Sequence, residues 1–304
     1  MDPDNQLIEK SQMILAIQQS IESGKGLAIG KLGHSEQLTL LFNQVLKNRI
    51  SLVTSAAARS LYVALKFHAE RQTGIFPTDF NFLSRYVDFY EKQVNQIDFI
   101  GLFGSPNEAK IIKSLSPETR FLKYTDTEPD RSEKYDPTRC YLPLFKNKKI
   151  LIVAPFANFA KQRAQKETFE QVWQKIGARW FEPDSFEAVE IPYSFIGQTS
   201  TFERFSDSLA LFEDITQQID CYDYDVALIA AGSLALPLAA HIKQKSKVAM
   251  SLGGHLQTLF GILGERWVRD AIWSERYINK HWVRLPDQLI PSNARLLADK
   301  QAYW

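Results

Sequence analysis

The sequence predicts an α/β fold with a doubly wound, mostly parallel sheet and helices on both faces. Two observations support this prediction. Short, continuous apolar runs alternate along the chain with longer segments whose apolar residues recur at helical spacing, and such runs are typical of parallel strands covered on both faces. Several of these runs end in glycine, directly before the first turn of an expected helix.

The first elements are a helix over residues 6–23, a strand over 27–32 and a helix over 35–47, with Gly33 at the turn between the last two. The same order of strand, turn and helix recurs later in the chain. Strands are expected at 96–104, 148–156, 225–232 and 247–254, followed by helices at 107–115, 158–176, 233–244 and 255–263. Two further strands are expected at 121–126 and 188–192. Aromatic residues near helical spacing in 80–92 favour core packing, with a platform that stacks on a ligand as the alternative.

Length and composition indicate a single domain over residues 1–304. A division into two lobes, 1–125 and 146–304, is the alternative, because the stretch 126–145 that would join them is polar and contains prolines. With 36 basic and 35 acidic residues, the formal charge of +1 argues against nucleic acid as a partner held by charge alone.

The compartment expected from the sequence is the cytoplasm. The chain has two cysteines, Cys140 and Cys221, with no CxxC spacing, and its N-terminus is too polar for a signal peptide. The most apolar window, 226–242, is interrupted by glycine and proline, so no transmembrane segment is expected.

Functional residues are expected beyond the carboxyl ends of the strands, where an open α/β sheet binds its ligands and where helix N-termini favour phosphate. The first such junction is His34-Ser35-Glu36. These side chains either serve the start of the helix or contact a ligand, and Glu36 suits the helix dipole in both cases. As a ligand contact, Glu36 would accept a hydrogen bond from a sugar hydroxyl or a metal-bound water, and His34 would carry a proton.

A second junction is Gly253-Gly254, followed by His255 and Gln257. Paired glycines after a strand let a ligand approach the backbone, although they also suit an ordinary tight turn. The motifs GxGxxG, GxxxxGK[ST], HExxH and GxSxG are absent. Their absence disfavours classical dinucleotide oxidoreductases, P-loop NTPases, zincins and α/β-hydrolases.

These residues resemble those of bacterial glycosyltransferases with the Rossmann-like GT-D fold and of their uncharacterised relatives in polysaccharide biosynthesis. In that fold the first strand ends in an R-F-G-D-G-E-like motif, and this chain has Lys31-Leu32-Gly33-His34-Ser35-Glu36, so that His34 replaces the first carboxylate. A closer likeness covers Ala231–Lys243 and Leu252–Gln257, then Phe260-Gly261, Gly264 and Arg266-Trp267. The resemblance extends over nearly the whole chain.

The resemblance implies a glycosyltransferase that moves a sugar from a nucleoside diphosphate, most simply a UDP-sugar, to a glycan or glycoconjugate acceptor. Glu36 is then the first candidate for the catalytic base, and His34 is the second. Substrate-binding residues would be Lys31, Gly33, Ser35, Gly232, Ser233, Gly253, Gly254, His255, Gln257 and Arg266. Glu36, with His34, would hold Mn²⁺ or Mg²⁺, and a reaction without metal is equally compatible with the replaced aspartate.

Two other functions remain open at the sequence level, again because the aspartate is missing. One is a non-catalytic protein that binds nucleotide sugars on the same fold. The other is a different nucleotide-dependent transferase, for a pyruvyl or phosphosugar group. The sequence also leaves open whether the protein is a homo-oligomer.

Overall fold

The computed structural model describes residues 7–128, 134–291, 293–294 and 303–304. Its centre is a seven-stranded, fully parallel sheet in the order β3-β2-β1-β7-β6-β4-β5. The strands are β1 (Leu27–Lys31), β2 (Phe99–Leu102), β3 (Arg120–Lys123), β4 (Lys149–Ala154), β5 (Ser185–Glu190), β6 (Val226–Ile229) and β7 (Val248–Ser251). A second, two-stranded sheet pairs β8 (Ile262–Leu263) with β9 (Val283–Arg284).

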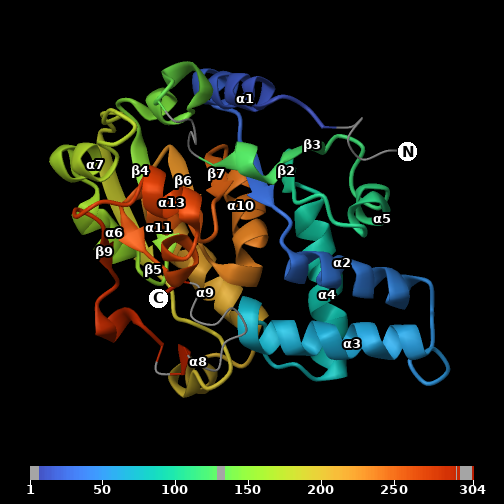
Figure 1. Ribbon diagram of the computed structural model, residues 1–304. Helices are drawn as coiled ribbons and strands as arrows, with labels where there is room; N and C mark the ends of the chain where they lie inside the picture. The colour runs from blue at the N-terminus through green and yellow to red at the C-terminus, as the bar shows by residue number, and fades with distance from the viewer. Residues whose placement is uncertain (1–6, 129–133, 292, 295–302) are drawn as a thin grey trace.

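Thirteen α-helices connect and cover the strands within the described residues (Figure 1). They are α1 (Lys10–Ser23), α2 (His34–Lys47), α3 (Ala56–His68), α4 (Phe80–Val94), α5 (Glu108–Ile112), α6 (Ala157–Arg163), α7 (Lys166–Val172), α8 (Thr199–Arg204), α9 (Ser208–Asp220), α10 (Ala235–Gln244), α11 (His255–Leu259), α12 (Glu265–Val268) and α13 (Ala271–Arg276). None of the helices in these ranges is long and apolar enough to cross a membrane.

The two faces of the sheet bury two separate hydrophobic cores. In β4, Ile150 and Ile152 face one core, which includes α1, α6 and α7. The alternate residues Leu151 and Val153 face the other core, which includes α4, α9 and α10. Because successive side chains of a strand point to opposite faces, this division requires helices on both faces. The doubly wound α/β fold predicted from the sequence is confirmed.

β7 is the last strand of the main sheet in the sequence, and it lies between β1 and β6 at the centre. Leu27 of β1 pairs with Val248 of β7, while Ile29 pairs with Phe99 of β2. Strands from both sides of residues 126–145 therefore belong to one sheet. The described part of that stretch also reaches the core, since Thr127, Tyr141 and Phe145 are fully buried.

Several predicted boundaries are wrong. The helix expected at 158–176 is two helices, α6 and α7, separated by Gln165 in an extended conformation. At the end of α6, Arg163 donates hydrogen bonds to the carbonyls of Phe260 (2.7 Å) and His281 (2.9 Å), and sequence periodicity does not encode these tertiary contacts.

Two other elements end earlier than expected. The strand expected at 121–126 ends at Lys123, because residues 124–127 form a 3₁₀ turn in which Thr127 Oγ1 donates to the Tyr124 carbonyl. The helix expected at 255–263 ends at Leu259, before Gly261 with its left-handed backbone and strand β8. The aromatic stretch 80–92 forms most of α4, and Phe82, Tyr86 and Tyr90 are buried in the core as expected.

Candidate functional site

A cavity of about 450 Å³ lies at the carboxyl edge of the main sheet. Its wall includes residues at or just after the ends of all seven strands of the main sheet. Ten residues predicted from the sequence line it: Lys31, Gly33, His34, Ser35, Glu36, Gly232, Gly253, Gly254, Gln257 and Arg266. The structure thus brings together residues that are more than 200 positions apart in the chain, as expected for the ligand crevice of an open α/β sheet.

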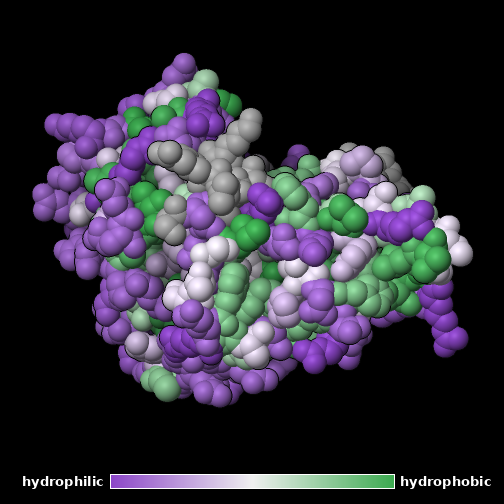
Figure 2. All heavy atoms as spheres, turned by 90° about the horizontal axis from the view of Figure 1, so that it is seen from below, coloured by the Kyte–Doolittle hydropathy of each residue, from purple (hydrophilic) through white to green (hydrophobic). Residues whose placement is uncertain are grey.

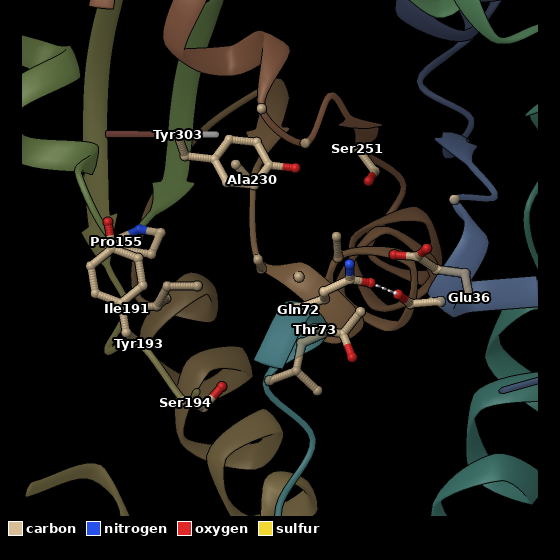
Figure 3. Close-up of a pocket in the computed structure, with 18 of the residues that line it drawn as sticks. Glu36, Gln72, Thr73, Pro155, Ile191, Tyr193, Ser194, Ala230, Ser251 and Tyr303 are labelled. Atoms are coloured by element: carbon tan, nitrogen blue, oxygen red, sulfur yellow. Dashed lines mark hydrogen bonds between the residues drawn. The ribbon is translucent and has the colours of Figure 1, made fainter. Parts of the chain in front are cut away.

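Opposite sides of the cavity differ in chemistry (Figure 3). Pro155, Ile191 and Tyr193 lie on one side, and Glu36 lies on the other, with Gln72 and Thr73 between them. The side with Tyr193 is apolar and aromatic, because Phe195 and Trp304 also line the cavity and pack against the Tyr193 ring. The cavity therefore offers a flat apolar surface at one end and a carboxylate at the other.

The start of α2 gives its three polar residues different environments. Gly33 is the residue before the helix, and no side chain caps it. Glu36, in the first turn, folds back so that its Oε2 atom occupies the space that a Cβ atom on Gly33 would need. A glycine is therefore required at position 33 for the Glu36 carboxylate to take this position.

Ser35 points away from the solvent and connects α2 to the end of α3. Its Oγ atom donates to Gln72 Oε1 (2.8 Å) and lies 3.2 Å from His68 Nδ1, which also contacts Gln72. Gln72 belongs to a single π-helical turn, η2 (Ala69–Thr73), and such turns are frequent at functional sites. Ser35 is therefore a positioning residue for the cavity wall in this structure, whereas His34 is exposed at the rim, edge-on to His68.

The charge of Glu36 acts on buried tyrosines behind the cavity wall. Burial raises the pKa of Tyr86 and of Tyr90 well above the usual range, and the negative charge of Glu36 adds to the increase in both. The same charge contributes to the raised pKa of Tyr124, where burial is again the main cause. These tyrosines therefore stay protonated at neutral pH.

Lys31 lines the cavity, but its ammonium group is held in a buried ion pair. Lys31 Nζ lies 2.9 Å from Glu128 Oε1 and 3.4 Å from His255 Nδ1, and it sits over the ring of Tyr124. His255 Nδ1 is also 2.9 Å from Glu128 Oε1. The positive charge of Lys31 is thus largely compensated within the protein. Lys31 is therefore a weaker partner for a phosphate than a lysine without such an ion pair.

Ser233 and His255 do not line this cavity, contrary to the expectation from the sequence. Ser233 is buried in the 3₁₀ turn Gly232–Leu234 before α10, and its carbonyl accepts a hydrogen bond from the Tyr86 hydroxyl (3.1 Å). His255 is 6% exposed and faces a neighbouring cavity of about 540 Å³. That second cavity shares Phe103, Tyr124 and Arg266 with the first, so these three side chains stand between the two.

The glycines at the strand ends have different roles. Both Gly232 and Gly253 have a left-handed backbone. A Cβ atom on Gly232 would lie 2.6 Å from the Thr73 carbonyl oxygen, so this glycine permits protein packing. A Cβ atom on Gly253 would meet nothing within 4 Å. The backbone at Gly253 is therefore the more accessible of the two to a ligand.

Two further polar side chains complete the cavity. Gln257 is 1% exposed, and its Nε2 atom donates to the Tyr303 carbonyl (3.0 Å). Its Oε1 atom has no hydrogen-bond partner among the residues that the structure describes. Arg266 lies over the ring of Tyr303. A ligand that donates a hydrogen bond to Gln257 Oε1 would relieve a buried unpaired acceptor.

The chain matches the family model of the GT-D fold-like domain over residues 8–259. It belongs to this family. No curated protein and no solved structure matches the chain in the corresponding comparisons. In this GT-D fold-like chain the matched region contains β1, the Glu36 turn, Gly253 and Gln257, whereas Arg266, Tyr303 and Trp304 lie outside it.

A divalent metal ion has few ligands in this GT-D fold-like site. Among the described ranges, no group of three or more His, Cys, Asp or Glu side chains is placed to hold a metal ion. Glu36 is the carboxylate that lines the cavity, and His34 is exposed at its rim. The protein side chains described here therefore do not fit a metal site of their own.

Sequence reasoning did not single out Gln72, Thr73 or Tyr193. Tyr193 directly follows the strand expected at 188–192, so the rule that strand ends carry function would have found it. Gln72 and Thr73 follow a helix, and no local pattern marks them. They reach the cavity because α3 packs against α2 and ends beside the β6–α10 turn.

Proposed function

We propose that the protein is a glycosyltransferase that uses a nucleoside-diphosphate sugar, most simply a UDP-sugar, and transfers the sugar to a hydroxyl of a glycan or glycoconjugate. The main support is the position of Glu36. Its carboxylate lines a cavity at the carboxyl edge of the sheet, across from an aromatic wall suited to a nucleobase. Membership of the GT-D fold-like family agrees with this function.

In the proposed complex the base of the nucleotide stacks at the side of Tyr193, where Pro155 and Ile191 supply apolar contacts. The diphosphate lies near the open backbone of Gly253, and Arg266 supplies positive charge from the rim. Gln257 Oε1 accepts a hydrogen bond from the base or the ribose. This order leaves the sugar at the Glu36 end of the cavity.

Glu36 then acts as the general base. It accepts the proton of the acceptor hydroxyl while that oxygen forms a bond to the anomeric carbon. The bond from the anomeric carbon to the diphosphate breaks, and its electron pair leaves with the nucleoside diphosphate. Arg266 stabilises the negative charge that develops on the leaving group. His34, at the rim, is the second candidate for the base. A metal ion is assigned no step, because the described side chains do not form a site for one.

The test is donor turnover by the purified chain. A panel of nucleoside-diphosphate sugars is incubated with and without acceptor glycans, and released nucleotide and transferred sugar are both quantified. Replacing Glu36 with Gln keeps the size of the side chain and removes the base, so turnover should fall by about 10²–10⁴-fold while nucleotide affinity in calorimetry is retained. Glu167→Gln is the matched control, because Glu167 is an exposed glutamate in the first turn of α7, outside the cavity.

Each other result identifies a different function. Nucleotide binding without turnover of any donor would favour a non-catalytic binding protein. Release of nucleotide without transfer of sugar would favour another nucleotide-dependent transferase. Full activity of Glu36→Gln would overturn the assignment of the base.

A further inference from the structure

Helices α2 and α3, with the turn between them, form a hairpin over residues 34–68 that extends away from the sheet (Figure 1). The inner side of this hairpin has its own small core, in which Leu38 and Phe42 of α2 pack with Leu65 of α3 and Val87 of α4. Its apolar inner residues are therefore already satisfied, and the outer side is available for another role.

The outer side of the hairpin exposes large apolar side chains. Val53 is 84% exposed, Val63 64%, Phe67 47% and Ile50 43%. Val63 and Phe67 lie four residues apart and thus on the same side of α3. Arg59, one turn before Val63, donates from Nη1 to the carbonyls of Leu52 and Val53, so the turn is folded against this same helix. In Figure 2, hydrophobic residues gather at the right-hand end of the molecule, which is the end that the hairpin occupies.

The hairpin is also basic. Residues 34–68 contain two lysines, two arginines and one acidic residue, Glu36 at the cavity end of α2, in a chain where 35 of 304 residues are acidic. Lys47 pairs with Glu91, and Lys66 lies 4.0 Å from Glu70, yet their side chains remain 56% and 48% exposed. Arg49 and Arg59 are exposed as well. Arg49 and Arg59 therefore add positive charge near the exposed apolar residues, whereas Lys47 and Lys66 have carboxylate partners.

We propose that the outer side of this hairpin docks on the surface of an anionic lipid bilayer. Apolar side chains that enter the boundary between head groups and acyl chains, with basic residues beside them, are typical of proteins that lie on a membrane without crossing it. Charge complementarity favours this partner over a second copy of the chain, because pairing two copies through this surface would bring the arginines of one copy against those of the other. The charge of nucleic acid would suit the arginines, but it leaves Val53, Val63 and Phe67 without a partner.

Docking in this way would place the cavity close to the membrane. α2 begins at the cavity wall and has 14 residues. At about 1.5 Å per residue, the turn that touches the lipid is about 20 Å from Glu36. Together with the proposed function, on which this step rests, this distance favours an acceptor carried by a lipid over a freely diffusing glycan.

The test is co-sedimentation of the full chain with phosphatidylcholine vesicles, with and without phosphatidylglycerol. The wild type should bind the anionic vesicles at least about tenfold more strongly than the neutral ones, and salt should weaken this binding. Val63→Ser with Phe67→Ser should reduce binding about tenfold or more without a change in charge. Arg49→Glu with Lys66→Glu should reduce it by at least about 25-fold, at about fivefold for each basic residue lost.

The matched control is Val268→Ser with Ile272→Ser, which removes two exposed apolar side chains (37% and 59%) from a different part of the molecule, α12 and α13. This control should bind as the wild type does. Circular dichroism and melting temperature verify that each variant is folded.

The proposal is overturned if the wild type ignores anionic vesicles, or if the control loses as much binding as the hairpin variants. It is also overturned if light scattering shows a dimer that the Val63 and Phe67 changes dissociate, since the surface would then join two copies. The vesicle assay contains no donor or acceptor, so its outcome is independent of whether the protein transfers sugar.

Discussion

The buried ion pair between Lys31 and Glu128 allows a quantitative prediction that does not depend on function. The side chains are 6% and 1% exposed, and Lys31 Nζ lies 2.9 Å from Glu128 Oε1. Replacing Glu128 with Gln removes the negative charge that lies 2.9 Å from the buried ammonium of Lys31. Breaking one half of a buried pair costs about 3–5 kcal/mol, because the remaining charge keeps its desolvation penalty.

The reverse change should cost less. In Lys31→Met, Glu128 still has His255 Nδ1 at 2.9 Å, and a protonated imidazole can keep the carboxylate paired. The double variant Lys31→Met with Glu128→Gln contains no buried charge at either position. It should therefore be at least about 2 kcal/mol more stable than the sum of the two single changes predicts.

Urea unfolding at neutral pH measures these differences. With an m-value of about 3 kcal/mol/M, Glu128→Gln should lower the midpoint by about 1–1.7 M. The control is the ion pair of Lys149 and Asp223, which is 2.6 Å long but has side chains that are 44% and 76% exposed. Replacing Asp223 with Asn should leave the midpoint within about 0.2 M, because solvent screens an exposed pair. A midpoint for Glu128→Gln within that same range, or an additive double variant, would refute the reasoning.

Three further predictions concern the cavity. In Gly33→Ala, the backbone at φ −70° and ψ 175° accepts alanine, but the added methyl group displaces the Glu36 carboxylate. Donor turnover should therefore fall at least about tenfold, while the free energy of unfolding falls by about 1 kcal/mol or less. Unchanged turnover would show that the position of the carboxylate is irrelevant. Mn²⁺ without nucleotide should shift the melting temperature by less than about 1 °C, because no group of three ligating side chains is placed for it among the described residues, and a larger saturable shift would reveal a site. Burial raises the pKa of Tyr193 to about 12, above the ordinary value of about 10. The free energy of unfolding should therefore keep the full contribution of the protonated Tyr193 below about pH 10. Between pH 10 and 12 it should fall by up to about 2–3 kcal/mol, because the tyrosine ionises more readily in the unfolded chain. Urea midpoints at about pH 9 and about pH 11 measure this loss, which should be smaller in Tyr193→Phe; an equal loss in both proteins would assign it to other tyrosines.

The sequence was sufficient to predict the fold class because each strand of a parallel sheet carries its own local signal. The apolar runs at Leu27–Lys31 and Val248–Ser251 are recognisable without knowing what they pair with. Their pairing was not predictable. β7 lies next to β1 through contacts that span more than 200 residues, and no pattern within either strand records the partner.

The candidate site was predictable to the extent that its residues follow strands. Glu36, Gly253 and Gln257 were found in this way, and all three line the cavity. The partners of a buried side chain follow no such rule. His255 stands in the same segment as Gln257, yet it turns to Glu128, which lies in a stretch that looked like a polar connection in the sequence.

The helix geometry also decides what His34, Ser35 and Glu36 are able to do together. Successive residues in an α-helix are about 100° apart, so residues i and i+2 do not face each other. In this structure α2 begins at His34, and both His34 and Glu36 are inside the helix. The two side chains therefore leave the helix in different directions. Replacing His34 should therefore change the position of the Glu36 carboxylate little. Gly33 is the residue that allows this carboxylate to fold back into the cavity. This geometry supports a base at Glu36 that works without a partner at position 34, and it makes Glu36 the residue on which the proposed activity depends.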